Sequence, residues 1–315
     1  SYEKGFFYDK IIFKQKRQTM YYNENSILFL DGQWVKASEA KVDLFSQTMH
    51  YGNGVFEGIR SYAGAAGPNI FKAKEHFERL KYSAERMGIK FNQSVDELVK
   101  VSYELLDRNG LSNAYIRPLV YLGANMKLLS CGEVHVMIAA WDWPPYLGDE
   151  ALKVMVSSFE RPNPKSIPVD AKVSGNYTNS IMASNEAKRK GFDEALMLDS
   201  DGYVAEGSGQ NFFFVKDDVI YTPPLGNILP GITRATIIEY AMELGYPVVE
   251  KLFKPEEMKG AEVAFFTGTA TEVASIATID DIEFKSDWKE TVAYDLFLMY
   301  RQRVSNAELS EFTLV

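Results

Sequence analysis

The sequence contains very little cysteine or histidine. Its 315 residues include one cysteine, Cys131, and three histidines, His50, His76 and His135. A single cysteine excludes an internal disulfide and fits a reducing compartment. Because the histidines are scattered, the spacing of a zinc site is absent and we expect no metal. Cys131 lies in no nucleophile motif, so we expect it to act as a small apolar side chain.

Long apolar runs and an excess of positive charge are also missing. No stretch reaches the roughly 18 uninterrupted apolar residues that cross a bilayer. Lysine and arginine number 34 against 43 aspartates and glutamates, which gives a net charge of −9. This balance argues against nucleic acid or an anionic membrane as partner. Residues 1–19 lack the apolar core and cleavage site of a signal peptide, so we expect a cytoplasmic protein.

The composition that remains, 46% apolar and 24% charged, is that of a globular protein. At about 150 residues per domain the length predicts two domains. Paired prolines near the midpoint, within Trp141–Gly148, cannot continue either neighbouring element and mark the boundary. We therefore expect an N-terminal extension (1–22), a small α/β domain (23–140), an interdomain loop (141–149) and a large domain (150–315). Mixed helices and strands make the fold α+β or α/β.

Local patterns predict the individual elements. Asp31-Gly32 between apolar runs predicts a hairpin, and Ser94 with Glu97 forms a capping box that begins a helix ending at Gly110. The further expected elements are strands at 114–122, 134–140, 153–159, 195–198, 211–215 and 263–266, and helices at 77–88, 177–190, 234–244 and 288–303.

The most informative stretch surrounds Lys172. This lysine lies among small and apolar residues and is followed by a Gly175-Asn176 bend and the hydroxyl of Tyr177. It is either a solvated loop lysine or an amine whose pKa, ordinarily about 10.4, is lowered by desolvation. In the second case it becomes nucleophilic enough to form an imine with an aldehyde. The residues alone leave both interpretations open.

Two further segments also allow two interpretations. Glu206 ends a strand beside Gly207-Ser208-Gly209, and is either solvated or faces a pyridine nitrogen that it keeps protonated. That turn lacks the third glycine of a dinucleotide fingerprint, since Phe212 stands there. Thr233 precedes a strong helix, where it either caps the helix or joins the free amides in binding an anion.

Taken together, the motifs resemble those of branched-chain amino-acid aminotransferases, fold type IV enzymes that use pyridoxal 5′-phosphate. The resemblance runs from about Asn23 to the C-terminus. It is carried by His50–Arg60, Ala114–Leu119, Ala171–Lys172 with Gly175–Tyr177, Glu206–Gly209, Leu229–Arg234 and Gly268–Ala270. It implies a two-domain, D-amino-acid-aminotransferase-like fold, α+β or α/β, whose smaller N-terminal and larger C-terminal domains enclose the cofactor in a cleft.

The resemblance implies a role for each cofactor-binding position. Lys172 is the catalytic residue and holds the cofactor covalently, Tyr177 bonds its phenolic oxygen, and Glu206 pairs with the ring nitrogen. Arg79 holds the phosphate, which agrees with the chemistry of arginine–phosphate pairs. The other implied cofactor-binding residues are Gly209, Ile232, Thr233 and Thr269.

The substrate side is implied in the same way. The α-carboxylate meets Tyr115 and the amides of Thr269 and Ala270, while Arg117 receives the second carboxylate of glutamate. The other implied substrate-binding residues, around a branched side chain, are Tyr51, Phe56, Gly58, Trp143 and Tyr146. Some pocket residues of the family come from a partner subunit, which implies a homodimer or a dimer-based oligomer besides the small-molecule substrates.

The expected reaction is reversible transamination of leucine, isoleucine or valine with 2-oxoglutarate. A D-amino-acid aminotransferase or an aminodeoxychorismate lyase of the same fold is the nearer alternative, and the Tyr115/Arg117 pair disfavours it. A non-catalytic cofactor-binding protein is the more distant one, and the intact set of Lys172, Tyr177 and Glu206 argues against it.

Overall fold

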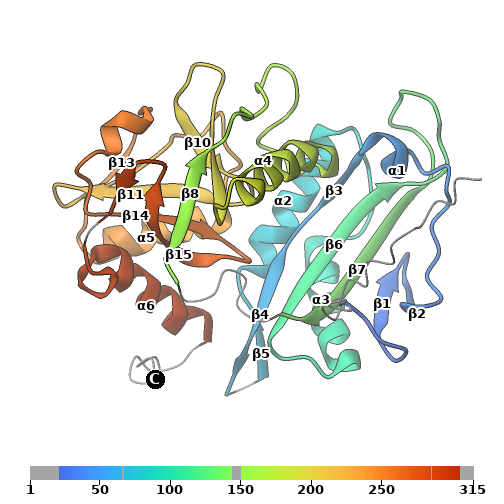
Figure 1. Ribbon diagram of the computed structural model, residues 1–315. Helices are drawn as coiled ribbons and strands as arrows, with labels where there is room; N and C mark the ends of the chain where they lie inside the picture. Colours follow the sequence, from blue (N-terminus) through green and yellow to red (C-terminus); the bar gives the residue numbers. More distant parts are fainter. Residues whose placement is uncertain (1–20, 66, 144–149, 285, 306–315) are drawn as a thin grey trace, which may run out of the picture.

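The structure, a computed structural model, describes residues 21–65, 67–143, 150–284 and 286–305. Its first half forms a seven-stranded sheet (Figure 1). In spatial order the strands are β2 (Gln33–Lys36), β1 (Ile27–Leu30), β7 (Val134–Asp142), β6 (Ala114–Leu122), β4 (Ile59–Gly64) and β5 (Gly67–Ile70), with β3 (Gly54–Phe56) paired to β6.

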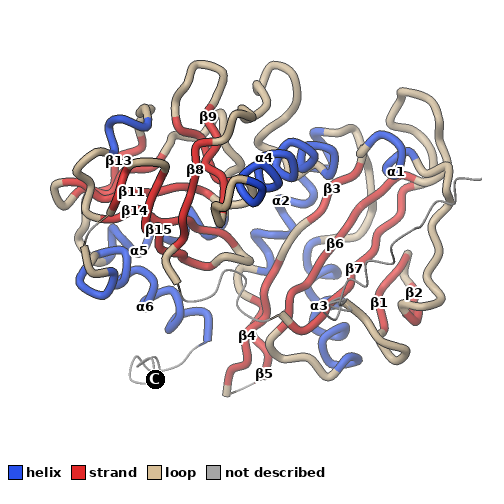
Figure 2. Tube along the Cα trace, viewed as in Figure 1, coloured by secondary structure: helices blue, strands red, loops and turns tan. Residues whose placement is uncertain are grey.

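The second half forms a nine-stranded sheet. Its order is β10 (Val204–Gly207), β9 (Glu194–Leu198), β8 (Leu152–Val156), β15 (Glu272–Ile279), β14 (Val263–Gly268), β11 (Asn211–Lys216), β12 (Val219–Thr222) and β13 (Val248–Glu250), with β16 (Ile282–Glu283) on β15. The α-helices are α1 (Gln47–Tyr51), α2 (Ala73–Arg86), α3 (Val95–Asn109), α4 (Tyr177–Arg189), α5 (Ile232–Glu243) and α6 (Val292–Ser305), and Figure 2 shows where they cover the strands.

The two strongest local predictions are confirmed. Asp31 and Gly32 adopt φ of 50° and 84° and join β1 to β2 in a two-residue hairpin. The Ser94 side chain accepts a hydrogen bond from the amide of Glu97, whose carboxylate bonds back to the amide of Ser94. Gly110 closes α3 in the left-handed conformation, as expected of a helix-ending glycine.

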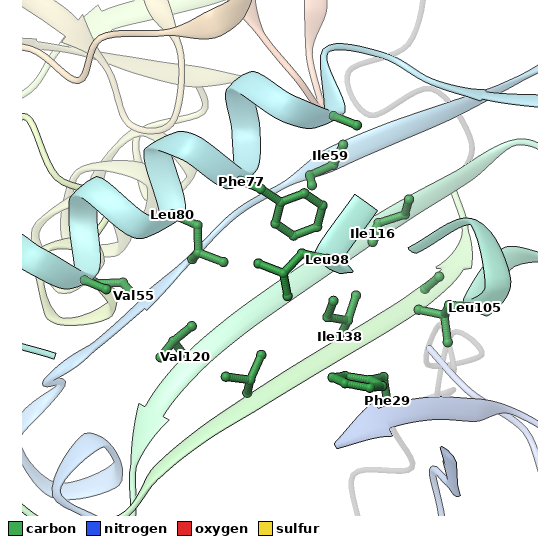
Figure 3. Packing of buried hydrophobic residues seen from close by; sticks show 14 of the residues in the cluster. Phe29, Val55, Ile59, Phe77, Leu80, Leu98, Leu105, Ile116, Val120 and Ile138 are labelled. Atoms are coloured by element: carbon green, nitrogen blue, oxygen red, sulfur yellow. The ribbon is translucent and has the colours of Figure 1, made fainter. Parts of the chain in front are cut away.

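The first sheet packs its core against α2 and α3. Phe77 and Leu80 from α2 and Leu98 from α3 are fully buried and meet Ile116 and Ile138 of the sheet (Figure 3). Burying each such side chain contributes about 1.5–3 kcal/mol. This core fixes α2, and with it the polar side chains that α2 carries on its other positions.

The second sheet is covered on one face by α5 and α6. Along β11, Phe213 points to this face and stacks on Phe265 of β14, with ring centroids 5.1 Å apart. Phe212 and Phe214 point to the opposite face and contact Phe253. This alternation is the period of a strand buried on both faces.

Some boundaries differ from the predictions. The helix expected from residue 234 begins at Ile232, and α6 begins at Val292, after a 3₁₀ turn at Trp288–Glu290. Seven strands were not predicted: β3, β4, β5, β12, β13, β15 and β16. In β4 and β15 a buried charged residue, Arg60 or Glu272, breaks the apolar pattern.

The mixed helix and strand content agrees with the α+β class. The domain boundary within 141–149 stays a prediction, since residues 144–149 lie outside the described part. Within the described residues, no helix is both long and apolar enough to cross a membrane.

Candidate active site

A cleft of about 700 Å³ receives residues from both sheets. Volumes of this size are typical of small-molecule sites. Its lining includes all but two of the predicted site residues: Phe56, Gly58, Arg79, Tyr115, Arg117, Trp143, Lys172, Tyr177, Glu206, Gly209, Ile232, Thr233, Thr269 and Ala270. The cleft thus collects residues from β3 to the turn before β15, far apart in the sequence.

Lys172 lies in the segment that leads into α4. Its backbone is held on both sides, because its amide bonds the Ser83 hydroxyl at 2.9 Å and its carbonyl accepts the Phe56 amide at 3.1 Å. Its Nζ donates to the Tyr177 hydroxyl at 2.6 Å and lies 5.0 Å from the centroid of the Phe56 ring. A fixed backbone with a cleft-facing amine is the arrangement that a nucleophilic lysine requires.

Glu206 is buried and held by three donors. The Arg161 Nη2 lies 2.7 Å from Oε1, the Asn211 Nδ2 donates to Oε2 at 3.0 Å, and the Leu229 amide reaches both oxygens. Burial raises the pKa of Glu206, and the Arg161 guanidinium opposes that shift. Since an ionised carboxylate offers about four acceptor positions, one remains for a donor in the cleft.

Arg79 is fixed by a second buried carboxylate, Glu57. The Arg79 Nε and Nη2 donate to the two oxygens of Glu57 at 2.6 and 2.9 Å, and His76 Nδ1 lies 2.7 Å from Oε2. Burial alone would raise the pKa of Glu57, but Arg79 and His76 outweigh it and hold the pKa far below 4.5. Burial lowers the pKa of His76 despite the attraction of Glu57.

The N-terminus of α5 opens into the same cleft. Its N-cap residue, Gly231, makes no side-chain cap, so the first-turn amides remain available. The Arg79 Nη1 donates to the Pro230 carbonyl at 2.8 Å, which brings the guanidinium to this helix end. The Thr267 Oγ1 lines the cleft and is buried without a partner among the described residues. Free amides, a fixed guanidinium and an unpaired hydroxyl together suit an anion.

The other end of the cleft is aromatic. The Arg117 guanidinium lies 4.7 Å from the Phe56 ring centroid and 5.3 Å from that of Tyr115. The Trp143 ring also contacts Tyr115, with centroids 5.2 Å apart and the ring planes tilted by 37°. A Cβ at position 58 would lie 1.9 Å from the Tyr115 hydroxyl, so glycine is the residue that leaves the Tyr115 side chain where it is. The Arg117 Nε is buried and has no acceptor in the described residues.

Comparison with known proteins agrees with this geometry. The family model for amino-transferase class IV matches residues 54–279. The chain belongs to the class IV aminotransferase family. A branched-chain-amino-acid aminotransferase from Pseudomonas aeruginosa is 44% identical over 264 residues, which cover 82% of this chain and 86% of the relative. One from Escherichia coli K12 is 41% identical, covering 81% and 85%.

The fold is shared with solved members of the family. The holo-form structure of a branched-chain amino acid aminotransferase from Thermobaculum terrenum superposes with a TM-score of 0.86 at 32% identity. It covers 91% of this chain and 97% of the other. These likenesses confirm the resemblance and the fold type stated from the sequence motifs. The roles of individual residues of this class IV aminotransferase stay predictions, taken up below.

One predicted residue, Tyr51, does not line the cleft in this structure, and the place of a second, Tyr146, is not described. Tyr51 lies on α1, is 47% exposed, and its hydroxyl is 3.4 Å from the Met126 carbonyl oxygen. It therefore does not reach the cleft of its own chain. Tyr146 lies outside the described residues.

The structure adds residues that the sequence did not single out. Glu57 and His76 orient Arg79, and Arg161 with Asn211 supports Glu206. A signal for Glu57 was present, since an acid within the apolar run Val55-Phe56 is unusual. Arg161 follows a strand and precedes Pro162, where an arginine reads as an ordinary loop residue, so it gave no such signal.

Proposed function

We propose that this protein is a pyridoxal 5′-phosphate-dependent aminotransferase acting on leucine, isoleucine or valine and 2-oxoglutarate. The observation that carries the proposal is the Lys172 amine, 2.6 Å from the Tyr177 hydroxyl in a cleft that also holds Glu206 and Arg79. The high identity with branched-chain aminotransferases supports this function over the two alternatives of the same fold.

The residues present fit each part of the cofactor. A phosphate dianion matches the uncapped α5 N-terminus, Arg79 and the unpaired Thr267 hydroxyl. The ring nitrogen matches the remaining acceptor position of Glu206, and the phenolic oxygen matches Tyr177. Backbone atoms can approach closely at position 231, where a Cβ would lie 1.8 Å from the Asn211 Oδ1.

Lys172 is the proton carrier in this proposal. When bound, pyridoxal phosphate supplies an aldehyde for the amino group and a ring that accepts an electron pair. The Lys172 amine would accept the proton that leaves the substrate α-carbon and donate it again later in the reaction. Tyr177 holds that amine at hydrogen-bond distance, and Glu206 keeps the ring nitrogen protonated by remaining ionised beside Arg161.

Substrate choice is assigned to the aromatic end. Phe56, Tyr115 and Trp143 surround a branched side chain, while the Tyr115 hydroxyl and the amides of Thr269 and Ala270 receive the α-carboxylate. Arg117 receives the second carboxylate of glutamate through its half-buried guanidinium, which packs against the Phe56 and Tyr115 rings and lines the cleft. One cleft thereby takes both an apolar and an acidic substrate.

The protein is further proposed to be a homodimer, or a dimer-based oligomer, in the cytoplasm. Large apolar side chains are exposed on α1, on the segment before it and on the neighbouring loop: Leu44, Phe45, Met49, Tyr51, Met126, Leu128 and Leu129. A surface of this kind marks an interaction site. A second copy would cover it and bring Tyr51 toward a cleft. The exposed free thiol of Cys131 is a state that reducing compartments maintain.

The test is the visible spectrum of the purified holoenzyme with leucine and then with 2-oxoglutarate, together with the turnover rate. We expect leucine to change the cofactor band, 2-oxoglutarate to restore it, and Lys172→Ala to lose at least about 10³-fold in turnover while retaining cofactor. Lys188→Ala, at an exposed lysine of α4, is the control and should keep wild-type turnover. Wild-type-like turnover of Lys172→Ala would refute the assignment.

A further inference from the structure

A buried ionic cluster lies directly behind the turn that carries Thr269 and Ala270. At its centre is Glu272, the first residue of β15, which is 7% exposed. Its Oε1 accepts the Tyr62 hydroxyl at 2.8 Å and lies 3.2 Å from the Arg60 Nη1. Its Oε2 accepts the Arg301 Nη1 at 2.6 Å. Each oxygen of this carboxylate is therefore occupied.

The four members of this cluster, Glu272 included, come from three separate elements. Arg60 and Tyr62 belong to β4 of the first sheet, Glu272 belongs to the second sheet, and Arg301 belongs to α6. Arg60 is itself buried, and its Nε has no acceptor among the described residues. The cluster consequently ties the two sheets together at a single carboxylate. If Glu272 lost its charge, Arg60 would be left buried without its counter-charge.

Glu272 has an unusual backbone conformation. Its φ is +57°, in the left-handed region where residues other than glycine are uncommon. Glu272 pairs with Gly268 across the β14–β15 hairpin, so residues 269–271 form the connection between them. A glutamate persists in this conformation only where its surroundings hold it. The contacts to Arg60, Tyr62 and Arg301 are the holding interactions.

The cluster also extends to the helix end that faces the cleft. The Tyr62 hydroxyl lies 3.4 Å from the Tyr300 hydroxyl. Burial raises the pKa of Tyr300, and a side-chain hydrogen bond from Thr233, in the first turn of α5, acts against that rise. The same group of side chains thus contacts both the 269–271 turn and the α5 N-terminus.

Neither Glu272 nor Arg60 nor Tyr62 lines the cleft, so none of them can touch a substrate there. We propose that Glu272, held by Arg60 and Tyr62, is a positioning residue that sets the 269–271 turn to receive the α-carboxylate of the substrate. The inference rests on the proposed function, which assigns that carboxylate to the turn. The inference adds the residues that orient the amides of the 269–271 turn.

The physical expectation is a selective loss. Amide donors act on a carboxylate only at about 2.7–3.1 Å and in line, so a shift of about 1 Å removes most of their effect. A relaxed turn should weaken binding of molecules with a carboxylate and leave binding of the apolar side chain unchanged. Cofactor binding should change less, because Arg79 and the α5 amides have anchors of their own.

The experiment compares Glu272→Gln and Tyr62→Phe with Glu186→Gln as a matched control. Glu186 is a buried carboxylate of α4 that accepts hydrogen bonds from Ser157, Ser158 and Lys190, and it has no contact with the turn. In each holoenzyme one measures the dissociation constants of 4-methylpentanoate, which is leucine without its amino group, and of 4-methylpentan-1-ol. The KM and kcat for leucine and the cofactor dissociation constant complete the set.

We expect Glu272→Gln to weaken 4-methylpentanoate, and to raise the KM for leucine, by about tenfold to a hundredfold, with a smaller change in kcat. The alcohol should bind within about twofold of wild type. Tyr62→Phe removes the hydrogen bond to Glu272 and the longer contact with Tyr300, keeps the charge of Glu272, and should weaken binding of 4-methylpentanoate by about threefold. This second variant decides the matter if Glu272→Gln does not fold.

Two outcomes overturn the inference, and they are distinguishable. If wild type transaminates leucine but Glu272→Gln and Tyr62→Phe match Glu186→Gln for both probes, the positioning role is wrong and the proposed function stands. If the variants bind 4-methylpentanoate and 4-methylpentan-1-ol more weakly by the same factor, the positioning role is likewise wrong and the proposed function stands. If wild type shows neither a leucine-dependent spectral change nor binding of 4-methylpentanoate, the proposed function fails and the inference fails with it.

Discussion

Two buried arginine–carboxylate pairs flank the cleft, and they are arranged in opposite senses. In the pair of Glu57 and Arg79, the carboxylate is fully hidden and the arginine lines the cleft. In the pair of Arg161 and Glu206, both side chains line the cleft, and the arginine supports the carboxylate. The first pair therefore presents a cation alone, whereas the second also presents an anion.

The difference lies in how many donors each carboxylate already accepts. Glu57 receives two hydrogen bonds from Arg79, one from His76 and one from the Gly58 amide. Glu206 accepts hydrogen bonds from the side chains of Arg161 and Asn211 and from the Leu229 amide. With about four acceptor positions on a carboxylate, Glu57 is saturated and Glu206 is not. The saturated carboxylate orients its arginine, whereas the unsaturated one remains able to bind.

The largest effect is expected from Glu57→Gln, which breaks the saturated pair. Arg79 would be left buried beside an amide, and breaking a buried ion pair costs about 3–5 kcal/mol. The free energy of unfolding of the apoprotein, from urea denaturation, should fall by that amount, and cofactor affinity should fall with it. Glu104→Gln, which breaks the exposed pair with Arg108 on α3, should stay within about 0.5 kcal/mol of wild type. Equal stability of the two variants would show that Glu57 does not anchor Arg79.

An intermediate effect is expected from Arg161→Met, which removes the support of Glu206. Burial then raises the pKa of Glu206 against only the weaker opposition of the Leu229 amide, Lys172 and Arg234, so the carboxylate takes up a proton at a higher pH. Because activity requires the ionised form, the acidic limb of the pH profile of kcat should move to higher pH. We expect kcat at pH 7 to fall by about tenfold or more. Arg161→Lys keeps the positive charge and should retain part of the wild-type kcat. An acidic limb that does not move in Arg161→Met would contradict the role of Arg161.

The smallest effect concerns His76, the third member of the saturated cluster. Its folded-state pKa lies below the ordinary 6.5, so the unfolded chain binds a proton that the folded chain does not once the pH falls below that value. Stability should therefore decrease between pH 7 and 5.5, by up to about 1.4 kcal/mol per pH unit. His76→Gln should lack this slope.

The lowered pKa of Glu57 acts in a separate window. That contribution to stability is present above the ordinary carboxyl pKa of 4.5 and is lost as the pH falls further. Urea titrations at pH 7.5, 6.5 and 5.5 therefore isolate the histidine. An identical slope in wild type and His76→Gln would mean that folding does not lower the pKa of His76.

Elements fixed by neighbouring residues could be predicted from the sequence. The Asp31-Gly32 turn and the Ser94 capping box each lie within four residues, and the structure confirms both. Strands β4 and β15 could not be found in this way. Each carries a charged residue, Arg60 or Glu272, which breaks the alternation of apolar and polar residues typical of a strand. The two residues are buried because they pair with each other, and they lie far apart in the sequence.

The candidate site divides in the same manner. Lys172 and Tyr177 are close in sequence and lie within one hydrogen bond of each other, so their motif could be identified. Assigning Arg79 depended on resemblance to a family, because nothing local distinguishes it from a solvated helix arginine. Arg161 was not predicted as a site residue. Its role depends on the ion pair with Glu206, which lies on a strand far from Arg161 in the sequence.

The place of α6 has a consequence for how the protein is made. Ribosomes deliver a chain from its N-terminus, and α6 is the last described helix to emerge, yet Tyr300 and Arg301 on it contact side chains of both sheets. The strands that line the cleft can form earlier, but the 269–271 turn gains its last anchor only after Arg301 has been synthesised. A nascent chain released before residue 300 would have most of the secondary structure of the enzyme. It would lack the Tyr300 and Arg301 contacts that hold the 269–271 turn of the cleft.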